Sequence, residues 1–381
     1  MYIHRKLELV LKTYLNAFPV IAVTGPRQSG KSTMLRKLFK KSHTYVTFDD
    51  FQIVNRFTDD PVGFFDSFSG PVIFDEAQKV PEIFDMIKLR VDQNREYGKF
   101  IISGSNQLHL LSKVKESLAG RIGIVNLFPF QFSEIPKKMR GEQEFRGSFP
   151  ELVIRKYSFD KEWYSAYLDT YVNKDVRQIS NIGNLRDFRM FINLLAANST
   201  RILNMSAYAS DIGVTVATIK HWISVLEASF IIFLLPPFYN NFGKRIIKAP
   251  KVYFYDTGFV SYLTGVRNEE LYNLGPMSGA IFENYIVSEI VKKHTHENSD
   301  CDFFYLRTSK GVEIDLIVDW RTRKEWLEIK KSSTFKSKMI QNLKLFSKKC
   351  DEKILIYKGE NINQSTWQAL NYQSYLEDYI G

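Results

Sequence analysis

The chain of 381 residues has very few cysteines and no long apolar run. Its two cysteines, Cys301 and Cys350, are too few to staple a protein of this length with disulfides, which is typical of a reducing cytosol. The longest apolar stretch runs only from Phe230 to Leu235, far short of the roughly 20 residues that a membrane-spanning helix needs. Residues 1–18 read as an amphipathic helix with scattered charges, unlike a signal peptide. The sequence therefore predicts a cytoplasmic protein with no membrane partner.

Positive charge is in excess. Lys and Arg number 52 and Asp and Glu 42, so the formal net charge is +10. Such an excess favours polyanionic partners, of which DNA is the first candidate. Hydrophobic residues make up 44% and charged residues 25%, which is ordinary for a folded chain and excludes a disordered one. Because one core rarely grows past roughly 250–300 residues, the length predicts two or three domains.

Short apolar, β-branched runs alternate with helical patterns over the first third of the chain. The runs are residues 20–23, 44–48, 72–74, 100–103 and 122–127. Strands separated by helices form parallel sheets that are covered on both faces. The fold class predicted for this part is therefore α/β.

The first predicted strand leads into a phosphate-loop pattern, GxxxxGK[ST]. The predicted ATP-binding residues are Gly25, Pro26, Arg27, Gln28, Ser29, Gly30, Lys31, Ser32 and Thr33. Glycines let successive backbone amides point at phosphate oxygens, and the start of the following helix adds partial positive charge. We expect Lys31 to reach the β- and γ-phosphates and the Ser32 hydroxyl to ligate Mg²⁺. The alternative is a glycine-rich turn without a ligand.

Polar residues end the third and fourth predicted strands, at the edge where ligands of parallel sheets bind. Asp75 and Glu76 follow the run at 72–74. We expect Asp75 to hold Mg²⁺ and Glu76 to act as a catalytic residue that orients or deprotonates the attacking water. After the fourth strand, Ser105 or Asn106 is expected to sense the γ-phosphate, and an ordinary turn is the alternative for each.

Residues 200–265 predict a helix-turn-helix followed by a hairpin. A short helix meets a turn at Gly213, a second helix starts near Thr215, and two apolar strands follow. The hairpin connection carries basic residues suited to phosphate contacts: Lys244, Arg245, Lys248 and Lys251. The second helix offers Thr215, Thr218, Lys220 and His221. The alternative is a winged-helix fold used for packing or oligomerisation.

Carboxylates gather in the carboxyl-terminal part at a nuclease-like spacing. Asp315 lies in one predicted strand, and Glu328 and Lys330 share a face of the next, so a hairpin would bring the three together. This is the PD-(D/E)xK arrangement, in which two carboxylates hold Mg²⁺ or Mn²⁺ and the lysine stabilises negative charge. Glu283, on the preceding helix, is placed to add a metal ligand. The alternative is a nuclease-like fold retained as an inactive scaffold.

These segments together resemble one prokaryotic family of AAA+-like ATPases nearly end to end. The matching stretches are GPRQSGKST, IFDEAQ, IISGSN, SLAGRIG, LFPFQFSEI, Arg5, GSFPEL, TYVNKDV, GAIFENYIVSEI and EIDLIV. The family usually has acid–Arg–Asp where this chain has Asn173-Lys174-Asp175, so a nucleotide-sensing role for that cation is in doubt here.

The resemblance implies an AAA+-type sheet with a helical lid, then a winged helix, then a restriction-nuclease-like α/β domain. The corresponding boundaries are 1–135, 136–189, 190–265 and 266–381. It further implies ATP binding with slow hydrolysis and ATP-dependent association or a homo-oligomer. In AAA+ ATPases an arginine at the place of Arg121 reaches a neighbouring subunit's nucleotide, and the alternative is a surface arginine on a helix end.

We therefore expect an Mg²⁺-dependent ATPase that controls a DNA-binding winged helix and a nuclease-like domain. Two other interpretations stay open. One is an ATP-gated switch or scaffold that binds DNA or protein and cuts nothing. The other is a nuclease whose phosphate-loop domain only binds nucleotide.

Overall fold

The computed structural model describes residues 2–104, 117–172, 185–238, 249–308, 311–345 and 351–379. The chain forms two compact units. The N-terminal unit comprises Met1–Phe130, Ala228–Phe230 and Thr295–Asn298. The C-terminal unit comprises Gln131–Glu227, Ile231–His294 and Ser299–Gly381.

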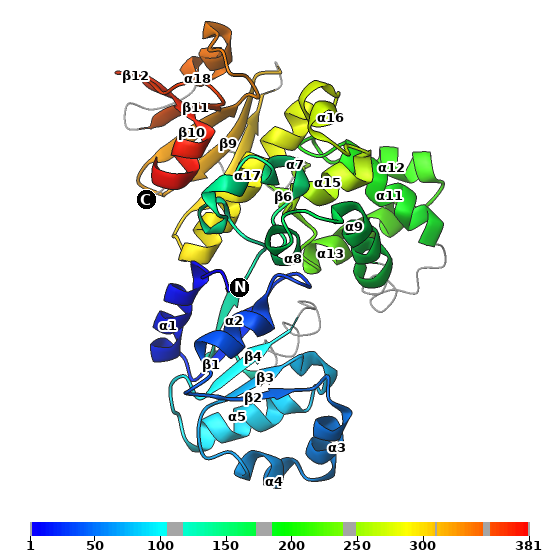
Figure 1. Ribbon diagram of the computed structural model, residues 1–381, viewed down its shortest axis with the longest axis vertical. Coiled ribbons are helices and arrows are strands. Elements are labelled where there is room, and N and C mark those ends of the chain that lie inside the picture. Colours follow the sequence, from blue (N-terminus) through cyan, green and yellow to red (C-terminus); the bar gives the residue numbers. More distant parts are fainter. Residues whose placement is uncertain are drawn as a thin grey trace. The chain divides into compact units, whose positions relative to one another are not determined.

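A five-stranded parallel sheet forms the centre of the N-terminal unit (Figure 1). Its order is β2-β3-β4-β1-β5, and all its pairings are parallel. The strands are β1 (Val20–Thr24), β2 (Thr44–Thr47), β3 (Val72–Asp75), β4 (Phe100–Ser103) and β5 (Ile122–Asn126). They lie where the apolar runs predict them, to within one residue at each end, and the predicted parallel α/β fold of this region is confirmed.

Helices cover both faces of this sheet because its strands are apolar on both sides. Residues of α1 (Leu7–Ala17) and α2 (Lys31–Leu38) pack with Ile21, Ile73 and Ile101 on one face. The opposite face carries α3 (Phe51–Asp59), α4 (Pro61–Asp66) and α5 (Ile83–Gln93). The two helix layers leave the carboxyl ends of β1 and β3 at one edge, where the phosphate loop and the acidic pair lie.

The C-terminal unit begins with a helical region. Short helices α7 (Gln143–Arg146), α8 (Pro150–Ile154) and α9 (Asp160–Tyr167) lead into a π-helical turn at Leu168–Val172. Three further helices follow: α11 (Leu185–Ala197), α12 (Met205–Ile212) and α13 (Val216–Ala228). Strands β6 (Ile232–Leu235) and β7 (Lys251–Phe254) then pair antiparallel. The helix, turn, helix and hairpin thus occur in the predicted order.

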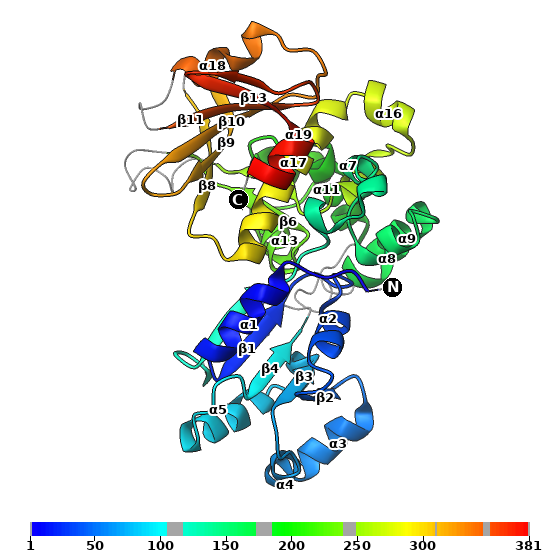
Figure 2. The ribbon, with the colours of Figure 1, turned by 60° about the vertical axis from the view of Figure 1, so that its left-hand side comes forward.

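A six-stranded sheet completes the C-terminal unit (Figure 2). Two helices, α15 (Thr257–Thr264) and α16 (Glu269–Leu274), lead to the long helix α17 (Ser278–Glu297), which packs on one face of the sheet. On the other face, Ile340 and Leu343 of the short helical segment at 337–345 pack against the strands. The order is β12-β13-β11-β10-β9-β8. The strands are β8 (Asp302–Arg307), β9 (Glu313–Asp319), β10 (Lys324–Ile329), β11 (Glu352–Tyr357), β12 (Ile362–Gln364) and β13 (Trp367–Asn371), with α18 (Gln341–Leu345) between β10 and β11.

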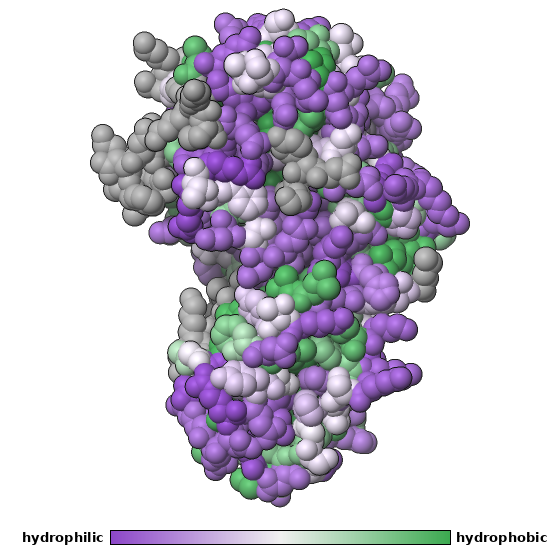
Figure 3. All heavy atoms as spheres, turned by 90° about the vertical axis from the view of Figure 1, so that its left-hand side faces the viewer, coloured by the Kyte–Doolittle hydropathy of each residue, from purple (hydrophilic) through white to green (hydrophobic). Residues whose placement is uncertain are grey.

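No helix in the described ranges combines the length and the apolar character needed to cross a bilayer. The face drawn in Figure 3 is predominantly hydrophilic.

Candidate nucleotide site and carboxylate cluster

The phosphate loop joins β1 to α2 through a backbone that needs glycine at two positions. Gly25 has φ 143°, and a Cβ there would lie 2.1 Å from the carbonyl oxygen of Leu127. Gly30 has φ 94° and directly precedes the first turn of α2. Both conformations are costly for residues with side chains. The loop therefore takes the curled form that points backbone amides inward, at the amino end of a helix.

Lys31 lies within this curl rather than in solvent. Its side chain is buried, and Nζ donates to the carbonyl oxygens of Gly25 at 2.9 Å and Pro26 at 2.8 Å. Burial raises the pKa of Glu76 and the charge of Lys31 partly opposes that rise, so the two groups lie within electrostatic range. The structure thus brings the loop lysine and the acidic pair to one place.

Asp75 ends β3 and is held by two hydroxyl groups from neighbouring strands. Tyr45 on β2 and Ser103 at the end of β4 both donate to its carboxylate. Burial, and then the charge of Asp75, raise the pKa of Tyr45 to about 12, so the phenol remains a donor at neutral pH. Arg36 and Ser32 of α2 partly oppose that rise, so both side chains lie near the Tyr45 hydroxyl.

Glu76 follows immediately in a strained backbone conformation, with φ 54°. Left-handed non-glycine residues of this kind concentrate at functional sites. Gln78 Nε2 donates to Glu76 Oε2 at 2.5 Å. Burial raises the pKa of Glu76 above its ordinary value, and Lys31 opposes that rise. A carboxylate with a raised pKa is suited to accepting a proton from water.

The residues at this edge fit an Mg–nucleotide complex. Ser32 and Asp75 supply the hydroxyl and carboxylate oxygens that Mg²⁺ prefers, and Tyr45 donates a hydrogen bond to Asp75. Ser29, inside the loop, has a buried hydroxyl for which the described part of the structure shows no hydrogen-bond partner. Arg27, Gln28 and Thr33 lie in the loop and the first turn of α2, as predicted.

Arg5, which precedes α1, stabilises the phosphate loop through a hydrogen bond to its backbone. Its guanidinium is buried and donates to the carbonyl oxygens of Ser29 at 2.9 Å and Phe128 at 2.6 Å. It also lies 4.7 Å from the centre of the Phe130 ring. The loop is thereby tied to the segment that follows β5.

We expect Arg5→Met to raise the KM for ATP about tenfold while leaving the chain folded, because removing the donor leaves two buried carbonyl groups unpaired, at about 1–3 kcal/mol each. The measurement is ATP turnover against ATP concentration, with a thermal melt for each variant. Lys12→Met, which changes an exposed residue of α1, is the matched control. An unchanged KM would show that Arg5 has no influence on the nucleotide.

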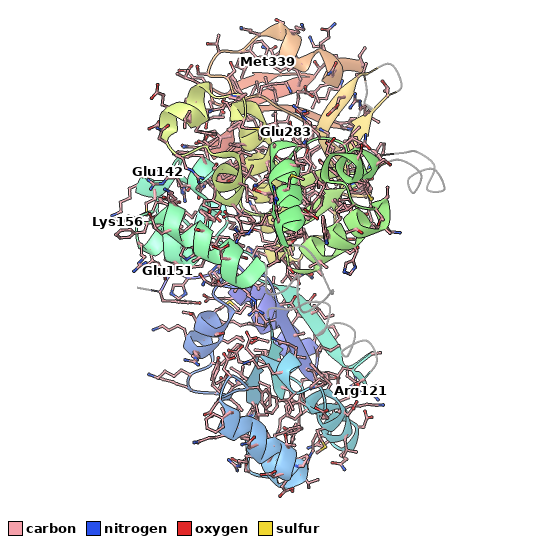
Figure 4. The ribbon with its side chains drawn as sticks, turned by 90° about the vertical axis from the view of Figure 1, so that its right-hand side faces the viewer. Arg121, Glu142, Glu151, Lys156, Glu283 and Met339 are labelled. Carbon is pink, nitrogen blue, oxygen red and sulfur yellow. The ribbon has the colours of Figure 1, made fainter. Side chains whose placement is uncertain are left out.

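The remaining predictions for the nucleotide site have different outcomes. Ser105 and Asn106 lie outside the described residues, as do Asn173, Lys174 and Asp175 of the C-terminal unit. Arg121 lies at the surface (Figure 4), where it forms a two-pronged ion pair with Asp92 of α5, Nε to Oδ1 at 2.6 Å and Nη2 to Oδ2 at 3.0 Å. Its side chain thus has a partner within its own chain, and a role in a neighbouring copy stays a prediction.

In the C-terminal unit the predicted hairpin brings Asp315, Glu328 and Lys330 together. Strands β9 and β10 pair antiparallel with Leu316 opposite Leu327. Lys330 Nζ lies 3.1 Å from Asp315 Oδ2 and 2.8 Å from Glu328 Oε1. The backbone amide of Ile329 also donates to Asp315, at 2.8 Å. Both carboxyl groups are buried, so this lysine is their main counter-charge.

Glu283, shown on α17 in Figure 4, joins this cluster through a second lysine. Lys251 Nζ lies 3.3 Å from Glu283 Oε1 and 2.5 Å from Glu313 Oε1, and the Tyr253 hydroxyl donates to Glu283 at 2.8 Å. The predicted role of Lys251 as a solvated phosphate contact is wrong, because its side chain is only 3% exposed and ion-paired. The predicted contacts Lys244, Arg245 and Lys248 lie outside the described residues.

Four carboxyl groups share two lysines in this cluster. Burial raises the pKa of Glu283 to about 7 and, with Asp315, that of Glu328 to about 8. Glu328 Oε2 is buried and has no hydrogen-bond partner in the described residues. That oxygen and the surplus of carboxyl groups over lysines offer the type of ligand that divalent cations prefer. Within the described ranges, however, no three His, Cys, Asp or Glu side chains are grouped closely enough to hold one.

In the segment predicted to form a helix-turn-helix, α12 and α13 are joined by a short turn. Gly213 has φ 81° at that turn, and the Thr215 hydroxyl accepts from the Thr218 amide at 3.1 Å, capping α13. Lys220 and His221 are exposed on α13. Ile202 forms an isolated antiparallel bridge with Lys251 of β7.

Two lysines that follow β10 have partners within the C-terminal unit. Lys331 Nζ lies 3.3 Å from the centre of the Tyr272 ring, and Lys358 pairs with Glu144 at 2.6 Å. These two lysines contribute to packing within the C-terminal unit.

The sequence reasoning missed four residues of the two sites. Ser103 ends the fourth strand, two residues before the predicted sensor position. Tyr45 lies on a strand with no acidic or glycine signal. Lys251 and Tyr253 share one face of β7 by alternation, which is the pattern that identifies them as a pair.

The chain matches three family models in succession. Residues 17–136 match an AAA domain. Residues 138–270 and 278–375 match two domains of unknown function, DUF8612 and DUF4143.

Uncharacterized proteins of Mycobacterium bovis and Mycobacterium tuberculosis are each 27% identical over 353 residues, 92% of this chain and 79% of theirs. Among solved structures, a Walker-type ATPase of Pyrococcus abyssi has 16% identity and a TM-score of 0.48, covering 68% of this chain and 94% of that one. RuvB of Thermotoga maritima has 14% identity and a TM-score of 0.30, covering 60% of this chain and 88% of that one.

Proposed function

We propose that the N-terminal unit, whose residues 17–136 match an AAA domain, binds ATP and hydrolyses it with Mg²⁺. The observation that carries this proposal is the curled phosphate loop with the buried Lys31 ammonium group inside it, at the edge of the sheet where Asp75 ends β3. Steady release of inorganic phosphate from ATP, stopped by chelation of Mg²⁺, tests it.

Each residue has a role that follows from its position. Lys31 and the loop amides bind the β- and γ-phosphates, and Ser32 and Asp75 would hold Mg²⁺, which neutralises developing phosphate charge when bound. Tyr45 and Ser103 orient Asp75 through their hydroxyl groups. Glu76 accepts the proton of the attacking water. ATP-dependent association of copies of this chain, with Arg121 acting between them, belongs to the same proposal.

We further propose that the C-terminal unit carries a metal-dependent nuclease-type site for DNA. The convergence of Asp315, Glu328 and Lys330 supports it, together with Glu283 and the unpartnered oxygen of Glu328. These carboxylates would hold Mg²⁺ or Mn²⁺, which polarises a scissile phosphate when bound. Lys330 would stabilise negative charge on that phosphate.

DNA binding is proposed for the helix-turn-helix and its hairpin. The three helices, the β6–β7 hairpin and the isolated bridge at Ile202 support a winged helix, which places its second motif helix in the major groove. Lys220 and His221 on α13 are the exposed basic groups available there. The net charge of +10 supports a polyanionic partner.

The alternative is an ATP-gated switch or scaffold with an inactive nuclease fold. One observation favours it: the carboxylates of the cluster contact lysines, and in the described residues they do not form a metal-binding trio. DNA cleavage separates the two proposals.

We expect Asp315→Asn to lower metal-dependent plasmid cleavage about 100-fold or more, because Asp315 is shared by the proposed metal site and Lys330. The measurement is conversion of supercoiled plasmid with Mg²⁺ or Mn²⁺, with and without ATP. Asp300→Asn, an exposed neighbour paired with Arg321, is the matched control. Intact plasmid with the unsubstituted chain, under conditions where ATP is hydrolysed, would favour the switch.

A further inference from the structure

One lysine of the carboxylate cluster, Lys251, lies outside the β9–β10 strand pair that carries Asp315 and Glu328. Lys251 starts β7, in the hairpin after the helix-turn-helix, and its side chain is almost completely buried among the acids of α17 and β9. It contacts Glu283 and Glu313, whereas Lys330 contacts Asp315 and Glu328. Each lysine thus bridges a different pair of carboxylates.

The backbone of Lys251 is held from both sides within the hairpin sheet. It pairs with Leu235 of β6 and forms the bridge to Ile202. The hairpin in turn lies along the edge strand β8, because the Tyr305 hydroxyl donates to the carbonyl of Ala249 at 2.8 Å and the Tyr305 amide donates to that of Pro236 at 3.0 Å. The position of the hairpin therefore fixes the position of the Lys251 ammonium group.

A divalent cation and this ammonium group compete for the same oxygen. Glu283 Oε1 accepts from both Lys251 and Tyr253, so a metal that takes Glu283 as a ligand must share or displace those contacts. Four carboxyl groups face two lysines here, of which Lys251 is buried and Lys330 is partly exposed, and half-exposed Arg307 reaches Glu313 at 3.8 Å. Since like charges repel strongly where water is excluded, the Lys251 charge weakens metal binding.

We propose that Lys251 is a tethered cation of the carboxylate site, which competes with the divalent metal for Glu283 and so makes metal occupancy depend on the hairpin. This inference rests on the proposed nuclease-type site. Lys251 is a positioning residue in this scheme, because it acts through Glu283. A shift of the hairpin that withdraws Lys251 frees the carboxylates for metal.

The test is Mn²⁺ binding to the full chain without nucleotide, measured by titration calorimetry. Binding at this site is the part that Glu328→Gln removes. We expect Lys251→Met to bind Mn²⁺ at least about tenfold more tightly than the unsubstituted chain, at the same stoichiometry. Lys251→Arg, which keeps the charge, should restore the original affinity, and Lys138→Met, at an exposed lysine, should change nothing.

Equal or weaker Mn²⁺ binding by Lys251→Met, with binding by the unsubstituted chain still sensitive to Glu328→Gln, would overturn the inference and leave the metal site standing. Absence of any binding sensitive to Glu328→Gln in both chains would overturn both.

A measurement on the unsubstituted chain covers the case in which Lys251→Met does not fold. Saturating Mn²⁺ should raise labelling of Lys251 by an amine-reactive reagent several-fold, detected by mass spectrometry. Lys292, buried and paired with Glu289 at 2.5 Å, is the internal control and should stay unlabelled. Mn²⁺ binding without a change at Lys251 would contradict the proposal.

Discussion

Lys31→Ala is expected to abolish ATP turnover and to weaken ATP binding at least about 100-fold. Lys31 is the buried cation of the phosphate loop, and its ammonium group lies between the loop carbonyls and within electrostatic range of Glu76. Charge-assisted bonds to phosphate are among the strongest that a side chain makes, and truncation to alanine removes them. Fluorescent-nucleotide titration and phosphate release measure the two effects.

The matched control is Lys37→Ala, which removes an exposed lysine two turns along the same helix. Its turnover should equal that of the unsubstituted chain. If Lys31→Ala hydrolysed ATP at the normal rate, the assignment of the loop as the ATP site would be wrong.

Glu76→Gln is expected to separate binding from chemistry. The amide keeps the size of the side chain but cannot accept a proton, so kcat should fall about 100- to 10,000-fold while ATP affinity stays nearly constant. Single-turnover hydrolysis and nucleotide titration measure the two quantities. Glu82→Gln, at the exposed start of α5, is the control. Loss of binding in Glu76→Gln would indicate a structural role instead.

The pH dependence follows from the environment of the same residue. Burial raises the pKa of Glu76, and Lys31 only partly opposes that rise. A general base acts when deprotonated, so kcat should be full above this pKa and fall as the pH drops through it. The acidic limb of the kcat profile should therefore lie above the ordinary glutamate range, and it should disappear in Glu76→Gln. A limb at the pH of a solvated carboxylate would contradict a buried base.

The sequence alone predicts the features that depend on local pattern. Apolar runs such as 72–74 and 100–103 identify the buried strands, and the glycine spacing identifies the loop because φ values like those of Gly25 and Gly30 admit few other residues. The pairing of Asp315 with Lys330 follows from strand alternation and a short hairpin.

Features that depend on how distant elements pack were not predictable in this way. Tyr45 contacts Asp75 only because β2 lies beside β3 in the sheet order. Lys251 looks like any basic residue of a hairpin until α17 and β9 place Glu283 and Glu313 against it. A lysine in a polar connection is usually exposed to solvent. The sequence pattern therefore predicts an exposed side chain for Lys251, whereas the structure has a buried one.

The contribution of Lys251 bears on how this polypeptide can be dissected or exchanged. The third family match begins at residue 278, so a fragment cut there would retain Glu283, Asp315 and Lys330 but leave Lys251 and Tyr253 behind. If that fragment were fused to an unrelated domain, its carboxylates would lack the positive charge of Lys251. A fragment that keeps every residue of this cluster must therefore begin before residue 251 and include β7 (Lys251–Phe254).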